Sequence, residues 1–284
     1  MKKKFSIGYF VIYLFLILWA LTTLFPLIWS VMNSFKDKKM IYSNSFSLPI
    51  GEAFSLENYR NIFANYNIFS AYRNSLIISG TVAFAVIFLA SMAAYIMCRY
   101  HFRLKKLLSL LLYAGMMFPI YSTIIPVLRM QAKWGIVNSP HVGLNLLSVI
   151  LPQIAGNLSF AIVVLTGYIK SLPIELEEAA YMEGSTAFQT FFQVVVPLTK
   201  PSFATVAIFS FLWSYNDLFT QMFFLRNQKY WAITRLMQML TSKEGTNYGL
   251  MASTVSLVVI PVIILYIFLQ KYIIKGMTAG AIKG

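Results

Sequence analysis

Long apolar segments constrain this chain more than any other feature of its sequence. A bilayer core about 30 Å thick is crossed by roughly 20 apolar residues of α-helix. Six segments of this length occur, each bounded by charges or by connectors rich in Pro, Asn and Gly: 8–32, 73–98, 107–129, 146–169, 201–224 and 251–272. Backbone groups inside a bilayer must be satisfied within the protein, so each segment is predicted to be helical. The sequence therefore predicts an all-α integral membrane protein with six transmembrane helices in a single domain, 1–284.

The composition agrees with a chain that meets lipid over most of its length. Hydrophobic residues make up 58% of the sequence and charged residues only 11%, whereas about 25% of an average soluble domain is charged. The net charge of +14 would suit nucleic acid, but Lys and Arg fall at the ends of the apolar segments, where they contact lipid headgroups. We therefore expect membrane lipid, and no nucleic acid, among the partners.

Residues suited to metal binding or phosphate binding are sparse. The only cysteine, Cys98, and the two histidines, His101 and His141, do not have the spacing of metal ligands. No G-x-x-x-x-G-K-[ST] phosphate loop occurs. We expect this chain to bind no metal and no cofactor, and to perform no covalent chemistry.

The basic residues also bear on orientation. Lys2–Lys4 precede an apolar run that is too long for a secretion signal and has no A-x-A cleavage site, so a retained anchor is expected. Six spans place both termini and the cluster 99–106 ("RYHFRLKK") on one side, and such clusters favour the cytoplasm. The first span has lysines at both ends, so charge alone leaves the orientation open. The connector 33–72 is predicted to form a short external cap.

Prolines and glycines mark further features. Pro119 and Pro126 in the third span and Pro261 in the sixth predict kinks rather than helix ends. After the sixth span, glycines follow the G-x-x-x-G spacing of helix dimers in lipid, but they lie among lysines outside the membrane. We therefore expect a flexible, extended tail over 273–284.

The connector 170–200 concentrates negative charge in a basic chain. It holds four of the nine acidic residues, Glu175, Glu177, Glu178 and Glu183. Pro173 suits the first turn of a helix, and three of the glutamates then follow near its positive end. The sequence predicts a short helix displayed at the membrane surface.

One face of this short helix is predicted to be thin. Leu176, Ala179, Ala180 and Glu183 follow the i, i+3, i+4, i+7 spacing that places residues on one side of a helix. The alanines would let a partner approach the backbone closely. Gly184 permits a turn, and Ser185 is predicted to cap a second helix that contains Phe188, Phe191 and Phe192 and leads into the fifth span.

The spacing within this connector resembles the EAA loop of permeases from ABC importers. The matching residues are Glu178-Ala179-Ala180, then Gly184, then Val194-Val195-Val196-Pro197. Stretches elsewhere are similar to maltose-type carbohydrate-importer permeases, above all to their smaller six-span subunit: "FPLIWSVMNSFK" (25–36), "FSLENYRNIF" (54–63), "YRNSLIIS" (72–79), "FPIYSTIIPVLRM" (118–130) and "YIIKGMTAGAIKG" (272–284). An incidental amphipathic connector is the alternative reading, and the agreement of spacing and topology disfavours it.

The resemblance implies a type I importer permease fold in a bacterial cytoplasmic membrane, with both termini cytoplasmic. It implies docking of the EAA loop, through Leu176, Glu178, Ala179, Ala180, Glu183 and Gly184, into a cleft on an ABC ATPase that alone holds ATP and Mg. It also implies that Thr278, Ala279 and Gly280 in the tail reach the ATPase interface. A second permease and an external sugar-binding protein would complete the transporter.

A polar stripe in the fifth span is a candidate translocation path. Asp217 is the only acid inside a span, and buried charges in membranes usually face other helices or water. With it lie Trp213, Asn216, Thr220 and Gln221, and Asn157 gives the fourth span a weaker stripe. Polar groups beside aromatic rings suit a sugar. The same stripe would equally serve to hold helices together.

Three other functions remain open at this point. The chain would serve as a permease for a non-sugar solute if the resemblance were limited to the transporter class. A stand-alone secondary transporter would need ion-coupling groups, and Asp217 is the only intramembrane carboxylate. A membrane scaffold without transport is disfavoured by the polar stripe.

Overall fold

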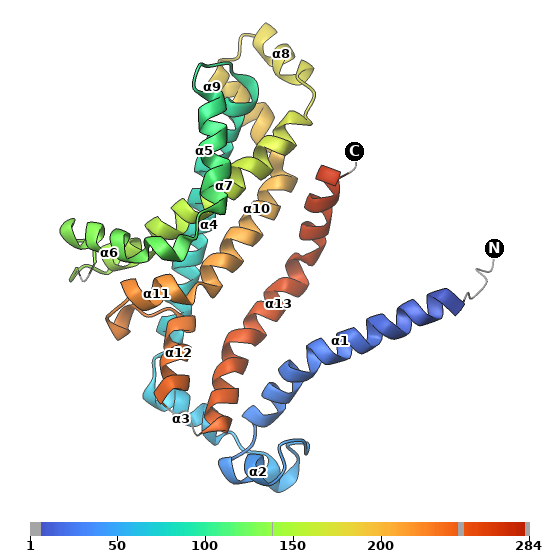
Figure 1. Cartoon of the computed structure of the whole chain (residues 1–284), viewed down its shortest axis with the longest axis vertical. Coiled ribbons are helices and arrows are strands. Elements are labelled where there is room, and N and C mark those ends of the chain that lie inside the picture. Colours follow the sequence, from blue (N-terminus) through green and yellow to red (C-terminus); the bar gives the residue numbers. More distant parts are fainter. Residues whose placement is uncertain (1–6, 138, 244–246, 282–284) are drawn as a thin grey trace. The chain divides into compact units, whose positions relative to one another are not determined.

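The computed structural model describes residues 7–137, 139–243 and 247–281, and every regular element in these ranges is a helix (Figure 1). The elements are α1 (Ile7–Ser34), α2 (Lys38–Ser43), η1 (Gly51–Ala53), α3 (Glu57–Asn65), α4 (Ile68–Arg99), α5 (Lys105–Met117), η2 (Ile120–Thr123), α6 (Ile124–Lys133), α7 (Val142–Lys170), α8 (Glu175–Met182), α9 (Ala187–Thr190), η3 (Phe191–Val195), α10 (Val196–Asn216), α11 (Leu218–Phe224), η4 (Gln228–Tyr230), α12 (Ile233–Lys243) and α13 (Tyr248–Ala281).

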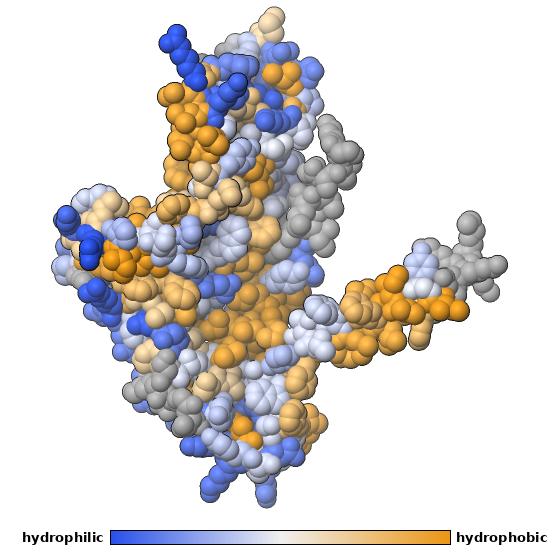
Figure 2. Space-filling model, in the orientation of Figure 1, coloured by the Kyte–Doolittle hydropathy of each residue, from blue (hydrophilic) through white to orange (hydrophobic). Residues whose placement is uncertain are grey.

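The described helices include five that are long and apolar enough to cross a membrane. They are α1, α4, α7, the continuous stretch Ala187–Asn216 and the part of α13 from Tyr248 to Phe268. A sixth crossing arises if the bent pair Lys105–Met117 and Ile120–Lys133 counts as one span. Figure 2 shows hydrophobic residues covering most of α1, as expected of a helix that faces lipid.

The predicted third span, 107–129, is not one kinked helix. α5 ends at Met117 and the following helical stretch begins at Ile120, with an angle of 93° between the two. Pro119 has no N–H to donate, and it forces the preceding residue, Phe118, into an extended conformation (ψ 128°). Pro126 lies in the first turn of α6, where its missing N–H is tolerated. The prediction of a continuous span was therefore wrong at Pro119.

The predicted fifth span, 201–224, is also interrupted. α10 ends at Asn216, and a separate helix, α11, begins at Leu218. Between them Asp217 adopts a non-helical conformation (φ −73°, ψ 89°), and its carboxylate accepts a hydrogen bond from the Thr220 N–H, 3.0 Å away. A carboxylate that caps a helix start in this way competes with the helical backbone bond. Asp217 thus marks a break, not the middle of a helix.

The tail differs from the extended segment that was expected. α13 continues to Ala281, so the backbone of residues 273–281 is helical. Gly276 and Gly280 each disfavour a helix by about 1 kcal/mol relative to Ala, but the Ile, Lys, Met and Ala residues around them favour one. Only the backbone of Thr278, Ala279 and Gly280 is described, and residues 282–284 lie outside the described part of the chain.

The chain divides into two compact units, and the first comprises Met1–Ile68 and Met237–Ile263. Its part of the connector, residues 33–68, contains a buried lysine, Lys36. The Lys36 ammonium lies 3.3 Å from the Asn44 carbonyl and 3.2 Å from the Ser45 carbonyl, and burial lowers the pKa of this side chain. The Asn58 amide donates to the carbonyls of Ser34 and Lys36, which ties α3 to the end of α1.

The start of α13 packs closely against this cluster. The Ser253 hydroxyl donates to the Ser34 carbonyl at 2.9 Å. Gly249 is buried one turn earlier, and a Cβ there would lie 2.8 Å from the Asn58 amide nitrogen and 3.0 Å from the Lys36 carbonyl oxygen. The absence of a side chain at Gly249 therefore allows the two segments to meet.

The second unit comprises Phe69–Leu236 and Ile264–Gly284. α10 and α5 pack against α7, and polar side chains of α4 hold the segment before α12. Asn74 donates to the carbonyls of Lys229 and Trp231, and the Ser75 hydroxyl accepts from the Ile233 N–H. Hydrophilic residues gather at the end of this unit that carries α8 and α9 (Figures 1 and 2).

Replacing Gly249 with Ala tests the contact between α13 and the connector. The added methyl has to displace Asn58 or the Lys36 carbonyl, and we expect a loss of about 1–3 kcal/mol in stability, as for other overpacked sites. The measurement is the thermal unfolding midpoint of the detergent-purified protein, together with protease cleavage within 33–68. Gly80→Ala is the matched control, because nothing lies within 4 Å of a Cβ there. Equal midpoints and cleavage for Gly249→Ala and the wild type would contradict the contact.

Candidate functional site

The segment between α7 and α10 forms a surface element at one end of the second unit (Figure 1). α7 ends at Lys170, and α8 occupies Glu175–Met182. The helix predicted in this connector is confirmed, but Pro173 precedes it: Ile174 is the N-cap residue, and Pro173 lies one residue earlier. Glu175, which with Glu177 and Glu178 makes the first turn acidic, lies near the positive end of the helix dipole.

The predicted turn at Gly184 is confirmed. Gly184 has φ +87°, its N–H donates to the Tyr181 carbonyl, and the Ser185 N–H donates to the Ala180 carbonyl, each at 3.0 Å. This pair of bonds is the Schellman ending of a helix, which places its C′ residue in the left-handed region that glycine adopts without steric cost. Gly184 therefore ends α8 and reverses the chain.

The second helix begins one residue later than predicted. Thr186, not Ser185, is the N-cap of α9 and forms a capping box with Gln189. The helix then widens into the π-helical stretch Phe191–Val195 before α10. Pro197 has no N–H to offer the Gln193 carbonyl and its ring crowds that carbonyl, so the wider turn accommodates the proline. Ala187–Asn216 thus forms one continuous helical stretch, the arm.

The outer face of α8 and α9 is exposed and partly apolar. Of the predicted docking residues, Leu176, Glu178, Ala179 and Glu183 are exposed and Ala180 is half-buried. Met182 is 89% exposed and Phe188 is 67% exposed; the sequence analysis did not single out Met182 for docking. Apolar side chains projecting from the polar end of a membrane protein indicate a surface that a partner covers.

The inner face of α8 is held by a buried ion pair that the sequence analysis missed. Glu177 is only 4% exposed, and its carboxylate accepts a 2.7 Å hydrogen bond from Nε of Arg99, the last residue of α4. The same guanidinium donates to the Leu172 carbonyl at 3.2 Å. The sequence held no signal that distinguished Glu177, because at 100° per residue the exposed Glu178 lies even farther around the helix from Leu176.

Aromatic side chains support the same junction. The hydroxyls of Tyr95 and Tyr181 lie 3.3 Å apart, and the Tyr95 ring lies 5.1 Å from that of Phe191. Tyr181 follows Glu177 by four residues, so both side chains leave α8 on the same side. The end of α4 therefore contacts α8 and the start of the arm together.

The predicted translocation residues divide into two groups. Trp213 and Asn216 are exposed, with Trp213 at 46%, and Asp217 is half-buried. Asn157, Thr220 and Gln221 are buried. Gln221 accepts from the Thr234 hydroxyl at 2.6 Å, so it connects α11 to α12. Thr220 and Gln221 therefore fit the packing alternative better than a path.

Asp217 is held in a small polar network. Gln153 of α7 donates from its amide to the Asp217 carboxylate at 2.9 Å, and the Ser214 hydroxyl donates to the Gln153 carbonyl oxygen at 2.6 Å. With the Thr220 N–H, two donors thus satisfy the carboxylate. This network joins α7 to the break between α10 and α11.

Exposed aromatic rings surround the two helix breaks. Tyr121, just after the Pro119 break, and Phe219, just after Asp217, have ring centroids 5.0 Å apart, and both are exposed. The Trp213 ring lies 4.9 Å from Phe160 of α7. Broken helices at membrane depth occur where the backbone is covered by protein or lines a water-filled cavity. The arrangement brings together polar groups and ring faces, as a path for polar solutes requires.

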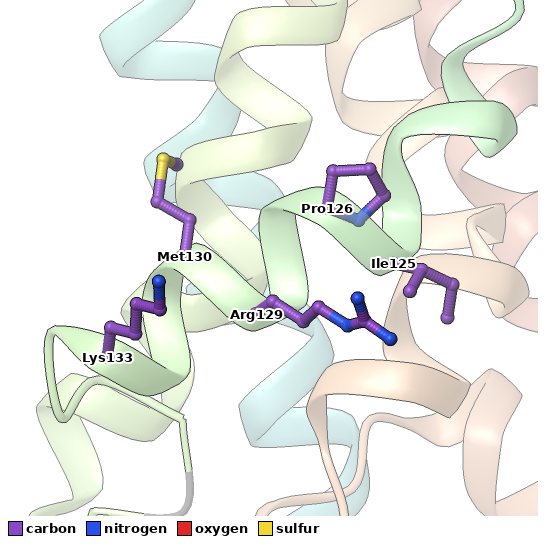
Figure 3. A pocket seen from close by; sticks show the side chains of 5 residues that line it. All are labelled: Ile125, Pro126, Arg129, Met130 and Lys133. Carbon is purple, nitrogen blue, oxygen red and sulfur yellow. The ribbon is translucent and has the colours of Figure 1, made fainter.

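A shallow pocket lies elsewhere, on the exposed side of α6 (Figure 3). Its lining side chains all come from that one helix: Ile125, Pro126, Arg129, Met130 and Lys133. None of the predicted site residues contributes to it. Because no facing element closes it, it does not resemble the enclosed sites that bind small molecules.

Comparison with known proteins identifies the family. Residues 86–279 match the model of the binding-protein-dependent transport system inner membrane component. The chain is 31% identical to the diacetylchitobiose uptake system permease of Streptomyces coelicolor, over 94% of this chain and 87% of that one. It is 30% identical to the melibiose/raffinose/stachyose import permease of Bacillus subtilis, over 86% of each chain.

A solved structure has the same fold. A chain of a bacterial ABC transporter for import of the acidic polysaccharide alginate superposes with a TM-score of 0.78, covering 95% of this chain and 99% of that one at 20% identity. At this level of identity the comparison shows the overall fold of the chain. The chain is a member of the family of inner-membrane components of binding-protein-dependent transport systems.

Proposed function

We propose that this chain is the permease subunit of an ABC importer that moves a di- or oligosaccharide into a bacterial cell. The observation that carries the proposal is the α8–α9 element, in which a glycine turn separates the two helices and exposed apolar residues lie at the start of the span Ala187–Asn216. α8 is the coupling helix and sits in a cleft of an ABC ATPase. ATP and Mg bind to that ATPase, and this chain is not itself catalytic.

The exposed face of α8 suits such a cleft chemically. Ala179 keeps the helix narrow, while Met182 and Phe188 supply apolar surface whose burial against a partner is favourable by about 25 cal/mol per Å². Glu178 and Glu183 are exposed as well, and they pair with basic groups of the ATPase. The tail residues Thr278, Ala279 and Gly280 reach the same interface, on the cytoplasmic side with both termini.

A carbohydrate is the solute that the path residues favour. Trp213, Tyr121 and Phe219 offer ring faces for the C–H side of a sugar, and Asn216 and Asp217 offer groups that bond its hydroxyls. Relatives named for diacetylchitobiose and for melibiose, raffinose and stachyose support this class. A second permease completes the path, and an external binding protein delivers the sugar.

The alternative functions fit less well. A secondary transporter needs a carboxylate free to exchange ions, whereas Asp217 is engaged by the Thr220 N–H and by Gln153. An importer for a non-sugar solute would share the coupling helix but would not need exposed rings around the helix breaks.

Reconstitution into liposomes tests the proposed function. The complex contains this chain, the second permease and the ATPase, with ATP inside and the binding protein outside, together with radiolabelled diacetylchitobiose, melibiose or raffinose. We expect ATP-dependent accumulation of at least one of these sugars, and no ATP hydrolysis by this chain alone. Hydrolysis by the isolated chain, or uptake by it driven by an ion gradient, would contradict the proposal.

Replacing Gly184 with Val tests the coupling helix. Nothing lies within 4 Å of a Cβ at this position, so the effect comes from the positive φ, which costs a branched residue at least about 1 kcal/mol and predicts a fall in uptake of about fivefold or more. Gly184→Asn should retain more uptake, because Asn tolerates this conformation. Gly167→Val, in α7 with equally free space, is the control. Wild-type uptake and ATPase activity in the Gly184→Val variant would refute the docking role.

Replacing Asp217 with Asn tests whether this residue lines the translocation path or only packs helices together. The Asn carbonyl still accepts from the Thr220 N–H, and Gln153 can rotate its amide to pair with the Asn NH2 and the Ser214 hydroxyl. Stability should therefore change little. A hydrogen bond to a charged acceptor is stronger than one to a neutral acceptor by about 1 kcal/mol. If Asp217 contacts the solute, uptake should therefore fall about fivefold. Unchanged uptake kinetics at unchanged thermal stability would assign Asp217 to packing alone.

A further inference from the structure

We propose that Arg99 and Glu177 are positioning residues that attach the coupling helix α8 to the span α4. This inference rests on the proposed function, because it concerns how movement of α8 reaches the membrane. α8 is joined covalently to α7 before it and to α10 after it. The ion pair adds a third span, α4, which is distant in sequence and is not directly connected to α8 along the chain.

The geometry of the pair suits a rigid attachment. Nε of Arg99 donates to Oε1 of Glu177 at 2.7 Å, and Nη2 donates to the Leu172 carbonyl at 3.2 Å. The guanidinium thus holds both the connector before α8 and the first turn of α8. Its planar donors fix an orientation as well as a distance.

Because the pair is buried, the loss of either partner is costly. The side chains of Arg99 and Glu177 are 12% and 5% exposed. An ion pair at the surface is screened by water and contributes little, whereas removing one partner of a buried pair leaves an uncompensated charge. A movement that separated Arg99 from Glu177 while both side chains stayed buried would leave both charges uncompensated, so α8 and α4 should move together.

The neighbouring contacts act in the same direction. Tyr95 of α4 contacts Tyr181 of α8 and Phe191 of the arm. Glu175, in the same first turn of α8, is exposed and makes no ion pair among the described residues. An acidic residue in the first turn of α8 is therefore not sufficient for pairing with Arg99. Glu177 forms the ion pair because it lies on the inner face of α8.

The alternative is that the pair only helps α8 to fold. The two roles predict different readouts. If the pair only supports folding, its loss lowers ATPase binding, ATP hydrolysis and uptake in parallel. If the pair transmits movement, its loss leaves the ATPase bound and hydrolysing, while fewer sugars are imported per ATP consumed.

The test uses the complete transporter in liposomes, supplied with whichever of diacetylchitobiose, melibiose or raffinose the wild type imports. Three quantities are measured: ATPase that co-purifies, ATP hydrolysed and sugar imported. For Glu177→Ala and Arg99→Met we expect at least half of the wild-type ATPase to co-purify and a fall of about tenfold in sugar imported per ATP. Arg99→Glu with Glu177→Arg should recover much of that ratio, and Glu175→Gln should match the wild type.

Two results would overturn the inference. One is an unchanged ratio of sugar to ATP in Glu177→Ala. The other is a parallel loss of bound ATPase, hydrolysis and uptake in the single variants, which would assign the pair to folding. The proposed function is tested separately by the wild-type complex: if that complex fails to import sugar with ATP, the proposed function fails whatever the variants do.

Discussion

A bilayer offers no hydrogen bonds to the backbone, and the architecture of this chain follows from that constraint. Long helices satisfy their backbone groups internally, as α1, α4, α7 and α10 do. At Asp217 a side chain replaces a backbone partner by accepting the Thr220 N–H. At Pro119 the missing N–H removes a donor altogether. Within the described parts of the predicted spans, non-helical backbone occurs at Phe118–Pro119 and at Asp217, beside the exposed rings of Tyr121 and Phe219.

The α8–α9 element lies outside the apolar segments, so contacts within the protein have to keep it ordered. Local hydrogen bonds stabilise the helix ends: the Schellman ending at Gly184 closes α8, and the capping box of Thr186 and Gln189 starts α9. The Arg99–Glu177 pair connects the element to α4. The result is a firmly held helix whose outer face remains free for a partner.

Periodicity and local turn chemistry made much of this architecture predictable. The apolar segments, the helix in 170–200 and the turn at Gly184 follow from patterns a few residues long. Features that depend on distant residues were not predictable in this way. Nothing near Glu177 in the sequence distinguished it from the other glutamates, and its role depends on Arg99 at the end of α4. At Pro119 the sequence predicts a kink rather than the helix end that the structure has. The break at Asp217 was missed because hydropathy stays high across it, although a capping acid was visible. Thr220 and Gln221 carry the same ambiguity, since a polar stripe looks alike whether it faces solute or another helix.

The coupling role of α8 is the central claim, and photo-crosslinking in membranes tests it most directly. A photoreactive amino acid replaces Met182, which is 89% exposed, in cells that produce the whole transporter, and replaces Phe10 of α1, 54% exposed, in a control. If α8 is the coupling helix, we expect an adduct between position 182 and the ABC ATPase, identified by mass spectrometry, and none from position 10. Absence of an ATPase adduct at position 182, or equal adducts from both positions, would contradict the coupling role.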